Sequence, residues 1–220
     1  MKKFINKIAE NIYVSKKDKL EELCIVLPSK RAGTFFKQAL ADLSDVPLWM
    51  PKIYSIEEWL EEISGFNILD RTSLLFELYI SYQKVFPKEE QESFEAFLKW
   101  APMLLTDFND ISAYLAKPEK LFDYLHQAKK IEAWTPIEGD PSAMVKNYLR
   151  FWELMGLLFA DFNKRLEIQH LAFQGMAYRK ASDVISNWIV EKKPSKQSIC
   201  YVGFNAMNPC EEHIMRTLIS

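Results

Sequence analysis

Ser29, Lys30 and Arg31 place a hydroxyl and two cations side by side, directly after a short and continuously apolar segment. This segment, residues 23–27 (LCIVL), is typical of a strand that is covered on both faces of a parallel sheet. Apolar residues then recur at helical spacing over 35–43. Ligands of α/β proteins usually bind at the carboxyl ends of strands, and the amides of a helix start attract anions. The three residues form a candidate anion site; the alternative is that both cations are solvated turn residues.

A second candidate combines an aromatic ring with two cations, at Tyr178, Arg179 and Lys180. An aromatic ring can stack on a nucleic-acid base while the cations neutralise backbone phosphates. The alternative is a helix in which Tyr178 belongs to the core and both cations lie on the solvated side.

Asp107 and Asp110 share one face of a helix, with Asn109 between them. Paired carboxylates can bind a divalent metal or transfer protons, but neither a histidine nor a third carboxylate is close in sequence. A solvated face, or ion pairs with lysine and arginine, is the favoured interpretation. We predict no metal site, and the familiar hydrolase motifs are absent, so we predict no catalytic residue in this chain.

Short strands and long helices would position these residues. Apolar periodicity predicts an opening helix over 4–13, and 52–54 fits a second short strand. Ser55 is a favourable N-cap for a helix over 56–63, whose first turn contains the acidic residues Glu57 and Glu58. Strand character returns at 199–202, before a helix that begins near residue 210.

The stretch from Asp70 to about Val190 is almost wholly helix-periodic and is interrupted only around prolines. We therefore predict an α/β protein in which a small parallel sheet is interrupted by a large all-helical subdomain, predominantly helical overall. The expected domains are 1–65 for the first part of the α/β domain, 66–195 for the helical insert, and 196–220 for the return to the α/β domain.

Composition limits the partners that this chain can have. The net charge of −2 argues against a polyanion-binding field over the whole surface, so nucleic-acid contact requires a local patch. Three cysteines without metal-ligand spacing indicate reduced thiols in a cytoplasmic protein. The first residues are too polar for a signal peptide and no apolar run reaches the length of a membrane span, so we expect no membrane partner.

Four segments, in this order, carry a resemblance to a known family. The chain resembles the amino-terminal part of AddB-type helicase-nuclease subunits, and more narrowly the PD-(D/E)XK nuclease family proteins of that type whose helicase portion has decayed. The segments are VLPSKRAGTFFKQAL, PKIYSIEEWLEEISG, ESFEAFLKWAPMLLTDFNDISAYL and CYVGFNAMNPCEEHI.

The resemblance implies a RecA-like sheet with an insert comparable to the 1B subdomain of superfamily 1 helicases. It also implies that LPSKRAG and IYSIEEW touch single-stranded DNA and that YVGFNAMN is the Walker B strand. The expected DNA contacts are therefore Ser29, Lys30, Arg31 and Ser55, which would bind phosphates and not bases. The implied partners are single-stranded DNA, a helicase subunit of AddA type and a carboxyl-terminal nuclease region beyond Ser220.

Two departures from the family pattern remove the nucleotide machinery. Residues 1–23 contain no glycine and hence no G-x-x-x-x-G-K-[ST] loop. After the strand predicted over 199–202, no carboxylate occurs before Glu211, whereas Walker B would supply one for Mg²⁺ directly after the strand. We therefore expect no ATP hydrolysis and no cofactor. The nuclease motif is also absent from this chain. In the family the nuclease domain lies far downstream, so the resemblance implies that a full-length protein could be an exonuclease.

Two alternatives from other classes remain open. One is a protein-interaction scaffold that makes no DNA contact, which the weak net charge also fits. The other is a nucleotide-dependent enzyme with an atypical phosphate site at SKRAG.

Overall fold

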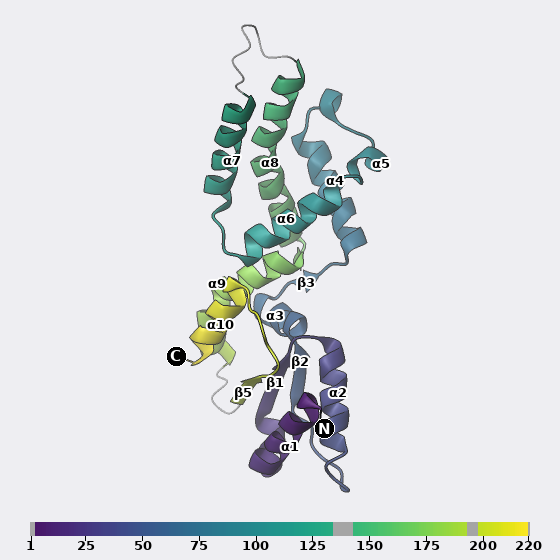
Figure 1. Ribbon diagram of the computed structural model, residues 1–220, viewed down its shortest axis with the longest axis vertical. Coiled ribbons are helices and arrows are strands. Elements are labelled where there is room, and N and C mark those ends of the chain that lie inside the picture. Colours follow the sequence, from purple (N-terminus) through teal and green to yellow (C-terminus); the bar gives the residue numbers. More distant parts are fainter. Residues whose placement is uncertain (1–2, 134–142, 193–197, 220) are drawn as a thin grey trace. The chain divides into compact units, whose positions relative to one another are not determined.

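A computed structural model describes residues 3–133, 143–192 and 198–219, and its chain divides into two compact units (Figure 1). Unit 1 comprises Met1–Ser64 and Ala181–Ser220, and unit 2 comprises Gly65–Lys180. The protein is mostly helical and contains a three-stranded parallel sheet in unit 1. This architecture confirms the predicted α/β class with predominant helix.

The sheet of unit 1 has the strand order β2-β1-β5, and both pairings are parallel. Its strands are β1 (Leu23–Leu27), β2 (Lys52–Ser55) and β5 (Ser198–Tyr201). All five residues of β1 are buried, as the continuous apolar run predicted. Leu23, Ile25 and Leu27 pack in one cluster with Phe36 and Leu40. Strand side chains alternate between faces, so Cys24 and Val26 lie on the opposite side of the sheet.

The helices of unit 1 follow the predicted order. They are α1 (Phe4–Lys16), the 3₁₀ segment η1 (Lys17–Glu22), α2 (Lys30–Ala41), α3 (Ile56–Ser64), the end of α9 (Gln174–Lys192) and α10 (Pro209–Ile219). The helix expected over 35–43 begins earlier, at Lys30, because Ser29 caps it. Apolar periodicity marks only the buried face of a helix and therefore misses a polar first turn.

Unit 2 packs its helices around aromatic side chains. The elements are α4 (Arg71–Val85), η2 (Lys88–Glu90), α5 (Phe94–Phe97), α6 (Ala101–Ala113), α7 (Pro118–Ala133), α8 (Ala143–Ile168) and the start of α9. Asp70 caps α4, as predicted, by accepting hydrogen bonds from the amides of Thr72 and Ser73. The helical stretch over 94–108 is divided into α5 and α6, and Pro102 lies at the start of α6.

The expectation that the insert is all-helical is wrong. Unit 2 also contains β3 (Asn67–Ile68) and β4 (Leu171–Ala172), which pair in parallel. Strands of two residues are too short to show a periodic pattern, so they could not be predicted from the sequence. The pair joins the segments where the chain enters and leaves unit 2.

The boundaries of the units differ from the predicted domains at one end. The first falls after Ser64, beside the predicted 65, whereas the second falls after Lys180 and not after 195. The reason is that the second half of α9 belongs to the core of unit 1: Ala181 and Ile185 are buried, and Trp188 packs edge-on against Trp59 with ring centroids 5.3 Å apart. The proline-rich break around residues 136 and 141, and most of the loop expected at 192–196, lie outside the described residues.

Candidate nucleic-acid interface

The first candidate site lies where β1 ends and α2 begins. Ser29 has an extended backbone, and its Oγ accepts a hydrogen bond from the amide of Ala32 at 3.2 Å. Ser29, Lys30 and Arg31 are all exposed. Both cations therefore lie in the first turn of a capped helix, at the carboxyl end of the central strand.

Neither cation is held firmly by the rest of unit 1. Lys30 Nζ lies 3.5 Å from Glu58 Oε1, and the two side chains are 68% and 39% exposed. An ion pair this exposed contributes roughly 0–1 kcal/mol, so Lys30 can exchange its partner for another anion at little cost. The Arg31 guanidinium lies over the Phe35 ring, 5.6 Å from its centroid.

Ser55 has a different role from the one the resemblance implies. Its side chain is buried, and its Oγ donates to Glu58 Oε2 at 3.0 Å and accepts from the Glu58 amide at 3.3 Å. The Ser55 amide donates to the same carboxylate at 2.9 Å. This reciprocal arrangement is a capping box, and the bond from the Ser55 amide is the largest cause of the lowered pKa of Glu58. Ser55 is the predicted N-cap of α3, and its hydroxyl is already engaged.

A second capping box begins α10. The amide of Asn208 donates to Glu211 Oε2, and the amide of Glu211 donates to Asn208 Oδ1, both at 2.9 Å. Burial raises the pKa of Glu211, and the bond from Asn208 partly offsets that rise. Glu211 was noted above only as a late carboxylate, although N-x-x-E at the start of an apolar helix, with the asparagine at the N-cap, signals such a box.

The two boxes distinguish α2 from its neighbours. The helices that follow β2 and β5 each have a glutamate of their own at the amino terminus, Glu58 in α3 and Glu211 in α10. The first turn of α2 contains no acidic residue and instead contains Lys30 and Arg31. A helix start attracts negative charge, and of these three only α2 leaves that attraction without a carboxylate of its own.

The end of β5, which the resemblance aligns with Walker B, is occupied by aromatic side chains. Trp59 Nε1 donates to the Tyr201 hydroxyl at 3.0 Å, and burial raises the pKa of Tyr201 to about 12. Tyr54 packs against Trp59 with centroids 5.4 Å apart, and its pKa is also raised, first by burial and then by its hydrogen bond to Glu62. This cluster could not be predicted from the sequence, because its members come from β2, α3 and β5 and no local pattern connects them.

The second candidate site lies in unit 2, and its three residues contact the protein itself. Tyr178 is buried and its hydroxyl accepts from Gln174 Nε2 at 2.9 Å, so its ring presents no free face to a base. Arg179 donates to the carbonyl of Ala116 at 2.7 Å. Lys180 lies 3.2 Å from a Glu167 carboxylate oxygen and also over the ring of Phe66. The structure therefore agrees with the alternative in which Tyr178 belongs to the core.

Asp107 and Asp110 are exposed on α6, while Asn109 between them is structural. Asn109 Oδ1 accepts from the amide of Gly175 at 2.7 Å and thereby connects α6 to α9 within unit 2. Burial, and to a lesser degree the charge of Asp110, raise the pKa of Asp107. Among the described residues, no group of three histidine, cysteine, aspartate or glutamate side chains is arranged to bind a metal ion.

Comparisons with known proteins do not identify the chain. No protein-family model matches it, and no curated protein matches it. Within the described residues, no helix is long and apolar enough to cross a membrane. The resemblance to AddB-type subunits therefore stays a prediction from the sequence motifs.

Proposed function

We propose that this chain is the non-catalytic, helicase-like region of a DNA repair helicase-nuclease, and that it guides single-stranded DNA past the start of α2. The observation that carries this proposal is the capped amino terminus of α2, with Ser29, Lys30 and Arg31 exposed at the carboxyl end of β1 and no acidic residue in its first turn. Backbone amides and two cations together suit a phosphate.

The ion pair between Lys30 and Glu58 fits a guiding role better than tight binding. A phosphate that binds Lys30 competes with the Glu58 carboxylate, which lies 3.5 Å away. Because both side chains are largely exposed, this exchange has a small free-energy difference in either direction. Binding should therefore be weak and reversible, as a strand that slides through the site requires.

The proposal assigns no chemistry to this chain. It has no P-loop sequence before β1, and the end of β5 carries the Tyr201–Trp59 hydrogen bond where a magnesium-binding carboxylate would be needed. ATP hydrolysis would fall to a helicase subunit of AddA type and DNA cleavage to a nuclease region beyond Ser220. The proposed setting is the cytoplasm, as the three cysteines without metal-ligand spacing indicate.

The test is fluorescence anisotropy of a labelled single-stranded oligonucleotide with the chain, from about 50 to about 200 mM salt, with a duplex as comparison. We expect micromolar binding of the single strand that weakens as salt rises. Replacing both cations, in Lys30→Ala with Arg31→Ala, removes two phosphate contacts. The log-log salt slope should then become shallower by roughly 1.4, at about 0.7 per contact for single strands.

The matched control is Lys7→Ala with Lys37→Ala, which removes the same charge from exposed positions of α1 and α2. This variant should keep most of the affinity. If the two double variants lose affinity equally, attraction is diffuse and the α2 site is wrong. If the oligonucleotide does not bind even at the lowest salt, the DNA-guiding function is rejected for this chain.

One observation favours the scaffold alternative without DNA contact. The segment after α2 exposes large apolar side chains, with Val46 61% and Trp49 81% exposed. Exposed apolar residues that cluster in this way often mark protein interfaces. Failure of the oligonucleotide titration, together with a self-association or partner contact that Trp49→Ser abolishes, would establish this alternative.

A further inference from the structure

Unit 2 contains a hollow of about 640 Å³ among α6, α7 and α8. Its walls are largely apolar and include Leu104, Phe108, Phe122, Phe151 and Met155. Helices α7 and α8 lie side by side (Figure 1), and residues of both helices and of α6 line the hollow. The volume is within the range of ligand-binding clefts.

The apolar surface of this hollow is only partly covered by the unit itself. Phe122, Phe151 and Trp152 are half-buried, and Met103, also part of the lining, is 70% exposed. On α6 the lining residues Leu104, Phe108 and Ile111 recur at i, i+4 and i+7, so the wall is a helical stripe. Grooves walled in this way accept the apolar face of another helix.

The hollow is also acidic. Glu92, Asp107 and Asp110 belong to the lining, which includes no lysine or arginine among the side chains that the structure describes. Glu92 accepts a hydrogen bond from Trp100 Nε1 at 2.9 Å, and none of the three carboxylates forms an ion pair within the part of the chain that the structure describes. Asp107 and Asp110 are one helical turn apart and repel each other. A cation placed over this pair would relieve the repulsion.

We propose that this hollow docks an amphipathic helix of a protein partner, whose apolar side chains enter among α6, α7 and α8 and whose lysine or arginine side chains face Asp107 and Asp110. The apolar stripe of α6 and the two carboxylates beside it, which form no ion pair with a described residue, select the same kind of ligand. The site is separate from the DNA site proposed for unit 1 and does not depend on that function.

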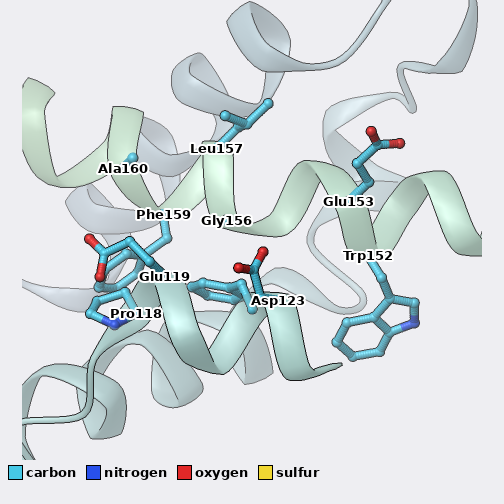
Figure 2. Close-up of a pocket in the computed structure, with 10 residues that line it drawn as sticks. Pro118, Glu119, Asp123, Trp152, Glu153, Gly156, Leu157, Phe159 and Ala160 are labelled. Atoms are coloured by element: carbon cyan, nitrogen blue, oxygen red, sulfur yellow. The ribbon is translucent and has the colours of Figure 1, made fainter. Parts of the chain in front are cut away.

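A second hollow of unit 2 provides the matched control. It has a volume of about 430 Å³ and lies along α7 and α8, where Glu119, Asp123 and Glu153 belong to its lining (Figure 2). Like the first hollow it includes three carboxylates and, within the described part of the chain, no lysine or arginine. It shares Phe122 and Trp152 with the first hollow, but its lining includes no residue of α6, so it lacks the helical stripe of Leu104, Phe108 and Ile111.

The test uses the full chain and a fluorescein-labelled synthetic helix of about 18 residues, with leucine at i, i+3, i+4 and i+7 and lysine elsewhere. A peptide of identical composition with the leucine stripe broken is the comparison. We expect the striped peptide to bind at least about ten-fold more tightly, because only it can place its leucines together in the hollow. Asp107→Asn with Asp110→Asn should weaken the striped peptide about five-fold.

Two control variants test the place of binding. Glu119→Gln with Asp123→Asn removes the same charge from the second hollow and should change affinity by less than about two-fold. Met103→Lys should weaken binding, whereas Tyr124→Lys, at a residue equally 70% exposed but outside the lining, should not. Lys30→Ala with Arg31→Ala should leave peptide binding intact, so failure of this proposal and failure of the DNA proposal are distinguishable.

Several results would overturn the docking proposal. If the two carboxylate double variants lost peptide affinity equally, or if the two peptides bound with equal affinity, the binding would be non-specific electrostatic attraction. Binding of benzyltrimethylammonium at this hollow without binding of the peptide would make it a site for small organic cations. Self-association that Met103→Lys abolishes, without peptide binding, would make it a contact between copies of this chain.

Discussion

The cores of the two units are built from different side chains. Around the sheet of unit 1 the buried residues are mainly aliphatic, such as Leu23, Ile25 and Leu27. In the core cluster of unit 2, eight of the 19 buried residues are aromatic, and Tyr82, Phe97, Phe108, Phe162 and Phe173 are fully buried there. A sheet presents a flat, closely spaced surface that branched aliphatic side chains cover well. Helices that cross one another leave wider and less regular spaces, which large rings fill in edge-on pairs.

The candidate surfaces differ in sign as well. Unit 1 exposes Lys30 and Arg31 at a helix start, whereas unit 2 exposes Asp107 and Asp110 beside an apolar hollow. The net charge of −2 conceals this difference, because it sums over both units. The comparison shows that a nearly neutral chain can still offer one surface to polyanions and another to basic partners.

The largest expected change in stability comes from replacing a glycine by alanine, and one glycine in each unit is compared. An alanine Cβ at position 175 would lie 2.1 Å from the carbonyl oxygen of Asn109, so Gly175→Ala forces α6 and α9 apart. We expect a loss of about 4 kcal/mol in the stability of unit 2. At Gly33 the nearest atom is Ile53 Cγ2 at 3.4 Å, and Gly33→Ala should instead be neutral or stabilising by up to about 1 kcal/mol through helix propensity.

Hydrogen exchange resolved by peptide mass spectrometry separates these effects, because it reports on each unit independently. Faster exchange confined to segments of 65–180 is the expected result for Gly175→Ala. Unchanged protection there would show that α6 and α9 do not approach as closely as described.

The next largest change in stability is expected from removing a tyrosine hydroxyl in the aromatic core of unit 2. The Tyr82 hydroxyl donates to the Glu90 carbonyl at 3.2 Å and accepts from the Glu92 amide at 2.9 Å. Tyr82→Phe leaves both backbone groups without this partner and should destabilise unit 2 by about 2 kcal/mol. Tyr79 makes a single bond, to the Glu92 carbonyl at 3.1 Å, so Tyr79→Phe should lose about half as much. Urea denaturation measures both, and equal losses would contradict the assignment.

A smaller effect distinguishes the two capping boxes of unit 1 by pH. The pKa of Glu58 is lowered from 4.5, so its contribution to stability is present above that value and is lost as pH falls through the lowered pKa. The pKa of Glu211 is raised from 4.5, so its contribution is complete below that value and is lost as pH rises through the raised pKa.

The stability of the two glutamine variants, relative to the unsubstituted protein, should therefore change with pH in opposite directions. Glu58→Gln should reduce stability at neutral pH and flatten the acid side of the curve, whereas Glu211→Gln should improve neutral stability relative to acid. Each change should stay below about 1 kcal/mol, since water screens Glu58 and Gln can still accept the capping bond at Glu211. Melting temperatures from about pH 3 to about pH 8 provide the measurement, and parallel profiles would refute the opposite shifts.

The smallest change in stability is expected from a substitution at the candidate DNA site. Lys30→Ala removes only an exposed ion pair at 3.5 Å, so the stability of unit 1 should change by no more than about 0.5 kcal/mol. A larger change in urea denaturation would mean that Lys30 is structural, and its effect on DNA binding would then have to be interpreted as indirect.

Local signals in the sequence were sufficient for most of unit 1. The buried strand β1, the cap at Ser55 and the alternation of strand and helix follow from short-range patterns, and the structure confirms them. Asp70 was likewise recognised as a cap in unit 2. Caps and continuous apolar runs are decided by neighbouring residues, which is why sequence reasoning reaches them.

Contacts between segments that are distant in the sequence could not be predicted. No residue near Gly175 in the sequence indicates that the Asn109 side chain accepts a hydrogen bond from its amide. The hydrogen-bond partner of Tyr201 is Trp59, which is far away in the sequence. The hollow among α6, α7 and α8 has the same cause, because it depends on how three helices diverge and not on any one of them. Asp107 and Asp110 were noticed for their spacing, but only packing shows the apolar surface beside them.

The short pair of β3 and β4 has a consequence for how this protein could have evolved. Asn67 and Leu171 are paired neighbours in that ladder, so the two ends of a segment of more than one hundred residues meet across a single strand spacing of about 4.8 Å. Such a segment behaves as a cassette: it could be lengthened, exchanged or excised, with a few residues of linker closing the gap. Variation in unit 2 among homologous chains need not disturb the sheet from which it departs.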